Sequence, residues 1–333
     1  MQIERDGGVL TAREIFDLVR EDLDRVEKAL DIESLASIEI VTTIGHHLQQ
    51  SGGKRLRPAL LLLCAHYSGG GGDTAVQLGA VVEMLHTATL VHDDVIDVAQ
   101  TRRGRVSANV QWGNHTCVLA GDWLYMQAFQ AALRLRNFHL LDLLIGLTQL
   151  MVEGELIQLD RIGKLEITEA DCMEVADRKT ACLFSACAKL GAVSAGAASD
   201  TEEKLGDFAW NLGMAFQLID DMLDFTSREA TLGKPVGGDL REGKVTLPLV
   251  YALEDATAAE KRMVETVLAD RNYEKIPFAD ILAMVDRRGG IQRTRERAAQ
   301  FTERAREIVA EFPASPYQKA LYTLTDLVTE RDR

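Results

Sequence analysis

Apolar residues recur every three or four positions along most of the chain, which is the period of an α-helix packing one face against a core. Residues 11–30 show this most clearly, because Thr11 and Glu14 form a capping-box signal and an apolar stripe runs from Ile15 to Leu30. Strand signals, meaning short runs that alternate apolar and polar residues between turns, are scarce. The pattern predicts an all-α fold.

Two later segments carry the same kind of start signal, a capping residue followed three positions on by an acidic residue. The signals are Thr168 with Asp171 and a stop at Gly191 for residues 168–191, and Ser199 with Glu202 for residues 199–225. Both segments are therefore predicted to be helices.

Glycine-rich and polar stretches mark the predicted loops. Residues 69–72 form a short loop, and residues 226–244 form the longest non-helical insertion, a length typical of functional or disordered loops. From about residue 255 to residue 333 the chain shows further amphipathic helices, broken near residues 287–290 and 312–316. We expect this last region to be scaffold.

Composition narrows the class of protein. The chain has 333 residues, 47% of them hydrophobic, and no Gly/Pro/Ser-rich linker, so we expect residues 1–333 to form a single domain. The net charge of −14 leaves no basic face to neutralise a phosphate backbone, which argues against a nucleic-acid partner.

Cysteine usage and hydropathy indicate the compartment. The 5 cysteines form an odd set without a CxxC pair, and the first ten residues do not resemble a signal peptide. Since no apolar run reaches the roughly 18 uncharged residues of a membrane-spanning helix, no transmembrane segment is expected. These features predict a cytoplasmic protein with reduced thiols.

The pattern Asp-Asp-x-x-Asp occurs twice, at residues 93–97 and 220–224. In each copy the first and last aspartates are four positions apart, so they lie on one helical face. An apolar helix precedes each copy, and a loop rich in glycine and basic residues follows it, at residues 101–105 and 232–244.

Like charges at such a helix end need a partner, because two carboxylates about 4 Å apart repel by up to about 4 kcal/mol near a protein surface. One copy alone is equally well explained as a solvated helix end, although negative charge at a helix C-terminus has the wrong sign for the helix dipole. Two copies in the same context favour a divalent metal, and Mg²⁺ suits carboxylate and phosphate oxygens. A calcium-binding EF-hand is not favoured, because its loop signature is missing.

Cations are available near both copies. Lys54, Arg55 and Arg57 follow a Gly-Gly pair and suit either a diphosphate cradle or an exposed basic turn, and Arg102 and Arg103 follow the first aspartate cluster. Four further polar residues lie in helical segments, and each has an ordinary structural explanation when considered alone. They are His86, Lys179, Thr180 and Gln217.

With these residues in view, the chain resembles the trans-type polyprenyl diphosphate synthases over almost its whole length. The motifs that carry the resemblance are "GGKRLRP", "LHTATLVHDDVID", "RRG", "KTA", "FQLIDDMLD" and "EGKVTLPL", in the order and approximate spacing of that family. The residues within these motifs are most similar to those of the long-chain branch, which includes bacterial octaprenyl diphosphate synthases. The resemblance implies a class I isoprenoid synthase fold, a helical bundle around a central active-site cavity.

The resemblance also implies roles for individual residues. The Mg²⁺ ligands would be Asp93, Asp97 and Asp220, which together with Lys179 form the expected catalytic set. Isopentenyl diphosphate would be bound by Lys54, Arg57, His86 and Arg103. The allylic diphosphate would be bound by Arg102, Lys179, Thr180, Gln217 and Lys234.

The expected chemistry fits this residue set. Chain extension ionises an allylic diphosphate, forms a carbon–carbon bond to isopentenyl diphosphate and releases a proton, so it needs no side-chain nucleophile, and no Ser-His-Asp or Cys-His constellation is evident. Metal ions and fixed cations stabilise the departing diphosphate, which is the expected proton acceptor. The loop at residues 226–244 is expected to close over the site and exclude water.

Product length is expected to depend on Ala88 and Thr89, five and four residues before Asp93. One helical turn rises about 5.4 Å, comparable to one isoprene unit. Aromatic residues close the tunnel here in short-chain family members, whereas small residues would let the tail continue towards Leu85 and Val81. The alternative is that Ala88 and Thr89 merely pack well in a helix pair.

The expected product is therefore long, about seven to ten isoprene units, with about eight as the best single expectation. The expected primer is farnesyl diphosphate and the expected use is a quinone side chain, with hand-off of the product at a membrane surface. The resemblance further implies a homodimer that pairs through long helices, with added contact from the apolar stripe at residues 15–30.

Three other classes of protein share features with parts of this sequence. A class I terpene cyclase shares the first motif but carries a mixed second motif, unlike "IDDMLD" here. A ferritin-like di-metal bundle needs two ExxH pairs, and Glu83 with His86 is the single one in this sequence. A non-catalytic partner of a prenyl synthase usually lacks the aspartate motifs, and a magnesium-dependent turnover assay separates it from an enzyme.

Overall fold

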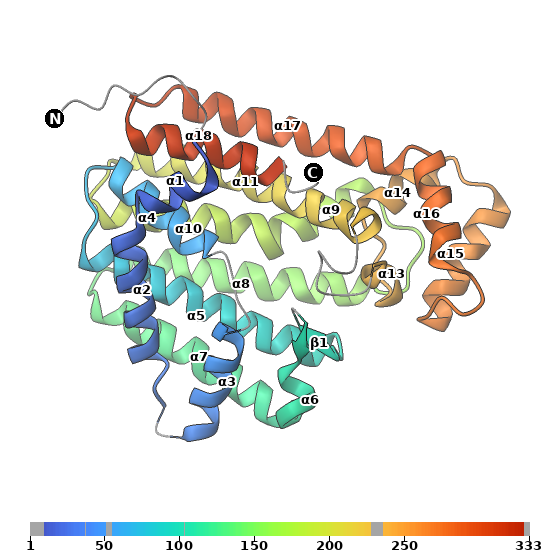
Figure 1. Ribbon diagram of the computed structural model, residues 1–333, viewed down its shortest axis with the longest axis horizontal. Helices are drawn as coiled ribbons and strands as arrows, with labels where there is room; N and C mark the ends of the chain where they lie inside the picture. Colours follow the sequence, from blue (N-terminus) through green and yellow to red (C-terminus); the bar gives the residue numbers. More distant parts are fainter. Residues whose placement is uncertain (1–9, 37, 51–54, 103, 228–235, 330–333) are drawn as a thin grey trace.

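The computed structural model describes residues 10–36, 38–50, 55–102, 104–227 and 236–329 (Figure 1). The fold is all-α, as the hydrophobic period predicts, and within these ranges the strands are a short antiparallel pair, β1 (Thr101–Arg102) and β2 (Arg105–Val106). The helices are α1 (Ala12–Asp17), α2 (Arg20–Glu33), α3 (Glu39–Gln50), α4 (Leu56–Tyr67), α5 (Asp73–Ile96), α6 (Ala108–Trp112), α7 (Asn114–Arg134), α8 (Phe138–Arg161), α9 (Glu169–Ala176), the π-helical turn η1 (Asp177–Ala181), α10 (Cys182–Ser194), α11 (Ser199–Thr226), α13 (Gly238–Arg241), α14 (Leu247–Glu254), α15 (Ala258–Asp270), α16 (Phe278–Arg287), α17 (Gly290–Ala310) and α18 (Pro316–Thr329).

The long helices α5, α7, α8 and α11 run roughly side by side, with α17 and α18 along one edge and α15 and α16 at one end (Figure 1). Helix α5 lies in the core of this bundle. Its length and mean hydropathy would allow it to cross a membrane, but 72% of that apolar window is buried inside the protein. Its apolar character is therefore explained by packing.

Two hydrophobic clusters make up most of the core. The larger one joins α2, α4, α5 and α10, and the second one joins α14, α15 and α16. Helices α11 and α17 contribute buried residues to both clusters, so each runs from one into the other.

The capping signals at Thr11 and Thr168 are confirmed, because both side chains accept the expected backbone N–H and both capping boxes are complete. The segment 11–30 is not one helix, however. Its backbone leaves helical geometry at Val19, which separates α1 from α2. The stripe is still buried on one side, since Ile15, Val26 and Leu30 are at most 1% exposed.

Two predicted boundaries are wrong. Gly191 does not stop its helix, and α10 continues to Ser194. A Cβ at Gly191 would lie 2.3 Å from the carbonyl oxygen of Leu61, so this glycine permits close packing of α10 on α4. Ser199 does not cap α11, because Ala198 occupies the N-cap position; Glu202 instead binds His139 (2.9 Å).

The predicted loops are largely as expected. Residues 69–72 separate α4 from α5, and α16, α17 and α18 are separated near residues 287–290 and 312–316. The described part of the segment 226–244 is not entirely irregular, because it includes the short helix α13.

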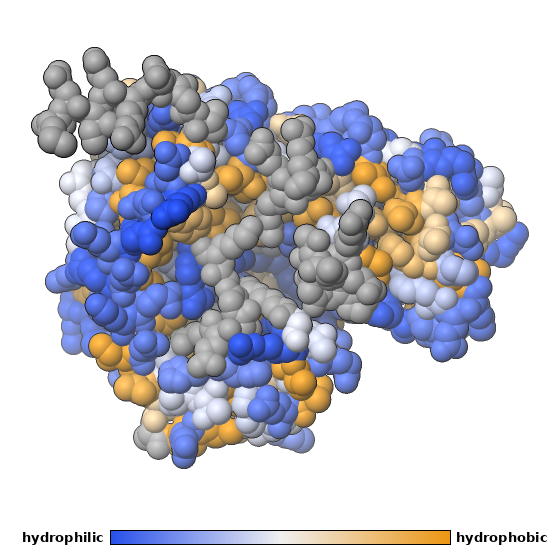
Figure 2. Space-filling view, viewed as in Figure 1, coloured by the Kyte–Doolittle hydropathy of each residue, from blue (hydrophilic) through white to orange (hydrophobic). Residues whose placement is uncertain are grey.

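The surface on the face in Figure 2 is mixed, with apolar groups gathered along the lower edge, where Figure 1 places α3, α6 and α7. Several of the exposed large apolar side chains of the described chain belong to α7 and α8. These two helices follow each other directly in sequence, although α7 packs mainly on α5, and α8 packs mainly on α10 and η1.

Candidate active site

The first aspartate cluster lies at the C-terminal end of α5. Burial raises the pKa of Asp93 to about 6; Lys179 and Arg102 oppose this shift, whereas the negative charges of Glu155 and Asp97 add to it. A carboxylate with so unfavourable a charged state has a strong electrostatic demand for a cation.

Asp94, the middle member of the cluster, is fully buried and accepts a hydrogen bond at Oδ1 from Arg102 Nε (2.5 Å). Its other oxygen, Oδ2, accepts no hydrogen bond from any residue that the structure describes. Arg102 thus forms an ion pair with Asp94. Its expected role in binding the allylic diphosphate stays a prediction.

Asp97 is linked to a distant part of the chain. Lys244 Nζ lies 2.9 Å from Asp97 Oδ1 and 2.7 Å from Glu242 Oε2. Burial lowers the pKa of Lys244, but the charges of Glu242, Asp97 and Asp239 outweigh burial and raise it. Lys244 is therefore a charged group held between Asp97 of the first cluster and the acidic side chains of Asp239 and Glu242.

The second cluster lies near the C-terminal end of α11, where its three aspartates have different surroundings. Asp220 is exposed. Burial and the nearby charge of Asp239 raise the pKa of Asp221 to about 8, even though Gln217 donates a hydrogen bond to its Oδ1 (2.8 Å). Asp224 is buried and accepts from the N–H groups of Gly238 and Asp239 (both 3.2 Å). Asp224 thus anchors α13.

Lys179 and Thr180 lie in the π-turn η1 between α9 and α10, and π-turns occur frequently at functional sites. Lys179 Nζ contacts Gln158 Oε1 (3.3 Å) and the carboxylate of Glu155, both on α8. Thr180 Oγ1 donates to Gln217 Oε1 (2.6 Å). The turn thereby connects α8 with the second aspartate cluster.

Gly154 on α8 makes this close contact possible. A Cβ at Gly154 would lie 2.7 Å from Arg178 Cβ and 3.0 Å from Lys179 Cγ. Any side chain at this position would push the π-turn away from α8. The predicted location of Lys179 in mid-helix is therefore correct, but its orientation depends on local packing.

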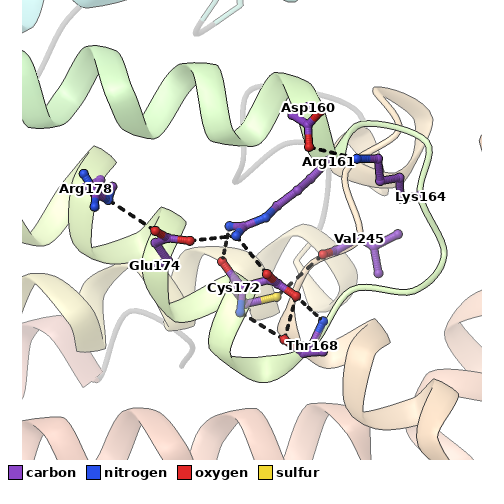
Figure 3. Close-up of polar contacts among 9 residues, drawn as sticks. Asp160, Arg161, Lys164, Thr168, Cys172, Glu174, Arg178 and Val245 are labelled. Atoms are coloured by element: carbon purple, nitrogen blue, oxygen red, sulfur yellow. Dashed lines mark hydrogen bonds and ion pairs between the residues drawn. The ribbon is translucent and has the colours of Figure 1, made fainter.

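A polar network between the end of α8 and α9 extends to Arg178 in the π-turn η1 (Figure 3). Arg161, at the end of α8, reaches Glu174 (2.7 Å) and Asp171 (2.8 Å) on α9, and Glu174 in turn approaches Arg178 (3.5 Å). Cys172 Sγ lies 3.7 Å from the carbonyl oxygen of Val245, the residue after Lys244. Val245, next to Lys244, is therefore in contact with α9, the helix that leads directly into the π-turn with Lys179.

Arg57 and His86 meet at the start of α4. Arg57 Nη1 donates to His86 Nε2 (3.1 Å), and the guanidinium lies 5.7 Å from the centroid of the Phe184 ring. The structure thus brings together two of the four predicted isopentenyl diphosphate ligands. Lys54, Arg103 and Lys234 lie outside the described residues.

The predicted chain-length residues differ in their surroundings. Ala88 is fully buried in a cluster with Ala120 and Leu124 of α7. Thr89 is partly exposed, and its Oγ1 donates to the carbonyl of His86 (2.7 Å). Ala88 therefore faces α7, and its role in product length stays a prediction.

Sequence reasoning gave no role to several residues near the aspartates. They are Glu155, Gln158, Lys244 and Tyr125, whose pKa is raised to about 12 by burial and by the charges of Asp93 and Asp122. Lys244 carried a signal, because it lies in the quoted motif "EGKVTLPL". Glu155 and Gln158 stand in an ordinary-looking amphipathic helix, which carries no such signal.

The donor set fits a hard divalent cation. The predicted ligands Asp93, Asp97 and Asp220 would supply its oxygens, and Asp94 of the first cluster has an Oδ2 atom that accepts no hydrogen bond from a described residue. Within the described ranges, no three His, Cys, Asp or Glu side chains converge closely enough to hold a metal by themselves. This arrangement suits Mg²⁺, which keeps several waters and completes its shell with substrate phosphates.

The single ExxH pair does not form a ferritin-like site. Glu83 is buried and binds Arg55 Nη1 (2.7 Å), while His86 accepts from Arg57. Both side chains are thus engaged by arginines, which disfavours metal binding at this pair.

Comparison with known proteins agrees with this geometry. The polyprenyl synthetase family model matches residues 38–284. Octaprenyl diphosphate synthase of Escherichia coli is 35% identical over 97% of this chain and 100% of its own, and all-trans-nonaprenyl-diphosphate synthase (geranyl-diphosphate specific) of Rhodobacter capsulatus is 36% identical over 96% and 98%. A polyprenyl synthase from Caulobacter crescentus, solved with calcium and isoprenyl diphosphate, superposes with a TM-score of 0.93 at 36% identity, covering 99% of this chain and 100% of its own.

The chain belongs to the polyprenyl synthetase family and has the class I isoprenoid synthase fold. More particularly, it is a trans-polyprenyl diphosphate synthase, a prenyltransferase close to the octaprenyl diphosphate synthases. Its family is metal-dependent and uses isopentenyl diphosphate and allylic diphosphates as substrates.

Proposed function

We propose that this enzyme condenses isopentenyl diphosphate repeatedly onto farnesyl diphosphate with Mg²⁺, giving an all-trans octaprenyl diphosphate for a quinone side chain. The observation that carries the proposal is the position of Lys244, which contacts Asp97 of the first aspartate cluster and lies in the field of Asp239. The backbone N–H of Asp239 donates in turn to Asp224 of the second cluster, so one short segment of chain is in contact with both clusters. The similarity to octaprenyl synthases over nearly the whole chain supports the product class.

In this proposal the aspartates and lysines of the site stabilise the departing diphosphate. Mg²⁺ ions held by Asp93, Asp97 and Asp220 would supply Lewis-acid stabilisation of the departing diphosphate. Lys179 and Lys244 form ion pairs with Glu155 and Asp97 in this structure. Their positive charges would also stabilise the negative charge that develops on the same diphosphate.

The second substrate would lie on the other side of the site. The Arg57–His86 pair would hold the diphosphate of isopentenyl diphosphate, so that its double bond faces the allylic carbon. The proposed reaction needs no side-chain nucleophile. The released diphosphate is the proton acceptor in this proposal. Closure of the segment 226–244 would exclude water from the allylic cation.

The direct test is a product assay. Purified enzyme with labelled isopentenyl diphosphate, farnesyl diphosphate and Mg²⁺ is expected to yield a C40 product, identified by chromatography after dephosphorylation. Geranyl diphosphate as a competing primer, and a C45 or C50 product, are the outcomes that would reassign primer and chain length. An enzyme that forms no prenyl chain would contradict the proposal.

The two diphosphate subsites predict opposite kinetic effects. Arg57→Ala should raise KM for isopentenyl diphosphate about tenfold or more, because it removes a charge-assisted contact of roughly 1.5–3 kcal/mol. Lys179→Ala should raise KM for the allylic primer instead. Steady-state kinetics with each substrate varied in turn measure both effects, and equal effects on the two substrates would contradict the division.

We also propose that residues 1–333 act as one domain, because α11 and α17 contribute to both major hydrophobic clusters. A cytoplasmic location with delivery of the product at a membrane surface completes the proposal. Co-sedimentation of product-loaded enzyme with lipid vesicles tests the delivery step.

A homodimer is the proposed assembly, and the exposed apolar residues of α7 and α8 support it. They recur at seven-residue spacing, the repeat by which helices pack against partner helices. The residues are Leu119, Met126 and Leu133 on α7, and Phe138, Ile145, Val152 and Leu159 on α8. Phe138 is 81% exposed, an unusual position for a phenylalanine unless a partner covers it.

The predicted contribution of the stripe at residues 15–30 does not hold. Ile15, Val26 and Leu30 are buried in the chain's own core. The exposed apolar residues nearby are instead Ile32 and Leu35, at the end of α2. Glu33 in the same turn contacts Gln127 of α7 (2.8 Å), so this corner adjoins the α7 surface.

Met126→Glu with Ile145→Glu is expected to convert the dimer to a monomer, because both charges would be desolvated in the interface. Light scattering at micromolar concentration measures the mass, and circular dichroism checks the fold. Tyr322→Glu, an exposed position on α18, is the matched control and should leave the dimer intact. A wild-type protein that is a fully active monomer would contradict the assembly.

A further inference from the structure

The three cations of residues 54–57 have the same appearance in sequence, but Arg55 has a distinct environment. Its Nε and Nη2 donate to the two carboxylate oxygens of Glu27 on α2 (2.5 and 3.1 Å), and its Nη1 donates to Glu83 on α5 (2.7 Å). The Arg55 side chain is 19% exposed and the Glu83 side chain 9%. The guanidinium is therefore directed into the protein, between two acidic side chains.

The backbone of Arg55 is also unusual. It has φ 47° and ψ 35°, in the left-handed region that non-glycine residues seldom adopt. This residue is the N-cap of α4, and its carbonyl accepts the helical hydrogen bond from Ala59 N (3.0 Å). The conformation and the ion pairs therefore fix the direction in which α4 begins.

This start of α4 is docked on α5 at two points. Arg55 binds Glu83, and Arg57 binds His86, which lies three residues further along the same face of α5. Glu27 adds a third point from α2. Loss of the Arg55 contacts would remove one of these fixed points next to Arg57, whose own contacts include His86 and Phe184.

We propose that Arg55 is a positioning residue for the isopentenyl diphosphate subsite. It clamps the start of α4 to α2 and α5 through Glu27 and Glu83, and so holds Arg57 against His86 without touching substrate. This inference rests on the proposed function, which assigns Arg57 and His86 to that substrate.

The competing role for Arg55 is that of a third direct phosphate ligand, and Glu27 separates the two. If Arg55 bound phosphate, Glu27→Ala would release the guanidinium and would leave KM for isopentenyl diphosphate unchanged or lower. If Arg55 is a clamp, Glu27→Ala weakens the clamp and raises this KM. Glu27 has a 43% exposed side chain in a helix, so alanine is well tolerated there.

The experiment compares KM for isopentenyl diphosphate, KM for the allylic primer and kcat in four variants. Arg55→Asn removes the clamp while asparagine tolerates the left-handed backbone. Arg55→Lys keeps the charge but cannot reproduce the forked contacts with both glutamates. Glu27→Ala tests the clamp from its other side, and Glu203→Ala, an exposed ion-pair partner of Lys189, is the control.

We expect KM for isopentenyl diphosphate to rise roughly tenfold in Arg55→Asn and several-fold in Glu27→Ala, because misplacement of a binding group costs rate and affinity. KM for the primer should not change, and Arg55→Lys should fall between wild type and Arg55→Asn. The double variant Arg55→Asn/Glu27→Ala should be no worse than Arg55→Asn alone.

An unchanged or lower KM for isopentenyl diphosphate in Glu27→Ala would overturn the clamp, as would equal rises for both substrates. Should Arg55→Asn fail to fold because Glu83 is left buried without its partner, the Glu27→Ala result decides alone. A wild-type enzyme that fails to use isopentenyl diphosphate would overturn the proposed function and this inference with it. Normal wild-type turnover with unaffected variants would overturn only the inference.

Discussion

Asp93→Asn and Asp220→Asn are each expected to lower turnover by about a hundredfold to a thousandfold or more, the loss typical of removing one preorganised group that stabilises charge in the transition state. Asp93 is largely buried beside Asp97 and Glu155, so its carboxylate is suited to a cation and not to apolar packing. Steady-state kinetics over a range of Mg²⁺ concentrations measure the loss. Full activity in either variant would contradict the assignment of the metal ligands.

The free energy of unfolding of metal-free Asp93→Asn tests the same assignment without an activity assay. The raised pKa of Asp93 means that the folded state favours the neutral carboxyl, so its contribution to stability is lost as pH rises towards and through about 6. Asparagine does not ionise, and metal-free Asp93→Asn should therefore be more stable than wild type at pH 8 by about 1–3 kcal/mol. Denaturant unfolding in a chelator measures the difference, and Mg²⁺ should stabilise only the wild type appreciably.

Ala88→Phe is expected to shift the product from long chains to short ones while the first condensation survives. A tail anchored by its diphosphate near Asp93 passes Ala88 after about one and a half helical turns, a rise of about 7.5 Å. Ala88 shares a buried hydrophobic cluster with Ala120 and Leu124 of α7, so a phenyl ring here would have to be accommodated between α5 and α7. Product sizing after incubation with excess isopentenyl diphosphate measures the shift.

A graded series makes this result specific. Ala88→Val, Ala88→Leu and Ala88→Phe should shorten the product in order of side-chain volume, while Thr89→Val, nearly equal in volume to threonine, serves as the neighbouring control. Overpacking the buried site costs about 1–3 kcal/mol, so melting temperature is recorded for each variant. Full-length product from a stable Ala88→Phe enzyme would mean that the tail takes another route.

The sequence was most informative where the signal is local or repeated. The capping boxes at Thr11 and Thr168 depend on residues three positions apart, and the structure contains both. The two aspartate motifs were recognisable because each repeats the same spacing in the same context. Ser199 is not a cap because α11 begins one residue earlier than predicted, with Ala198 at the N-cap, and Glu202 contacts His139, 63 residues away, which local spacing does not encode.

Contacts between distant segments account for most of what could not be predicted. Lys244 and Asp97 are 147 residues apart, so no helical period relates them. Arg55 and Arg57 are both plausible phosphate ligands in sequence, and only the positions of Glu27 and Glu83 distinguish them. The close approach of η1 to α8 depends on a missing Cβ at Gly154, which looks like any helical glycine in the sequence.

The π-turn at Asp177–Ala181 makes the site sensitive to a change that alters no functional side chain. Such a turn holds one residue more than an α-helical turn, so deleting a single residue between Ala176 and Cys182 would let the helix close into a regular spiral. The flanking helices α9 and α10 would keep nearly the same relative rotation, because the deletion removes the residue that the π-turn holds in excess. Within the turn, however, the remaining side chains would be redirected, since successive residues of a regular helix point about 100° apart. A one-codon deletion in this turn would thus leave the bundle and the lysine in place, but would change the direction of Lys179 relative to Glu155 and Gln158 on α8.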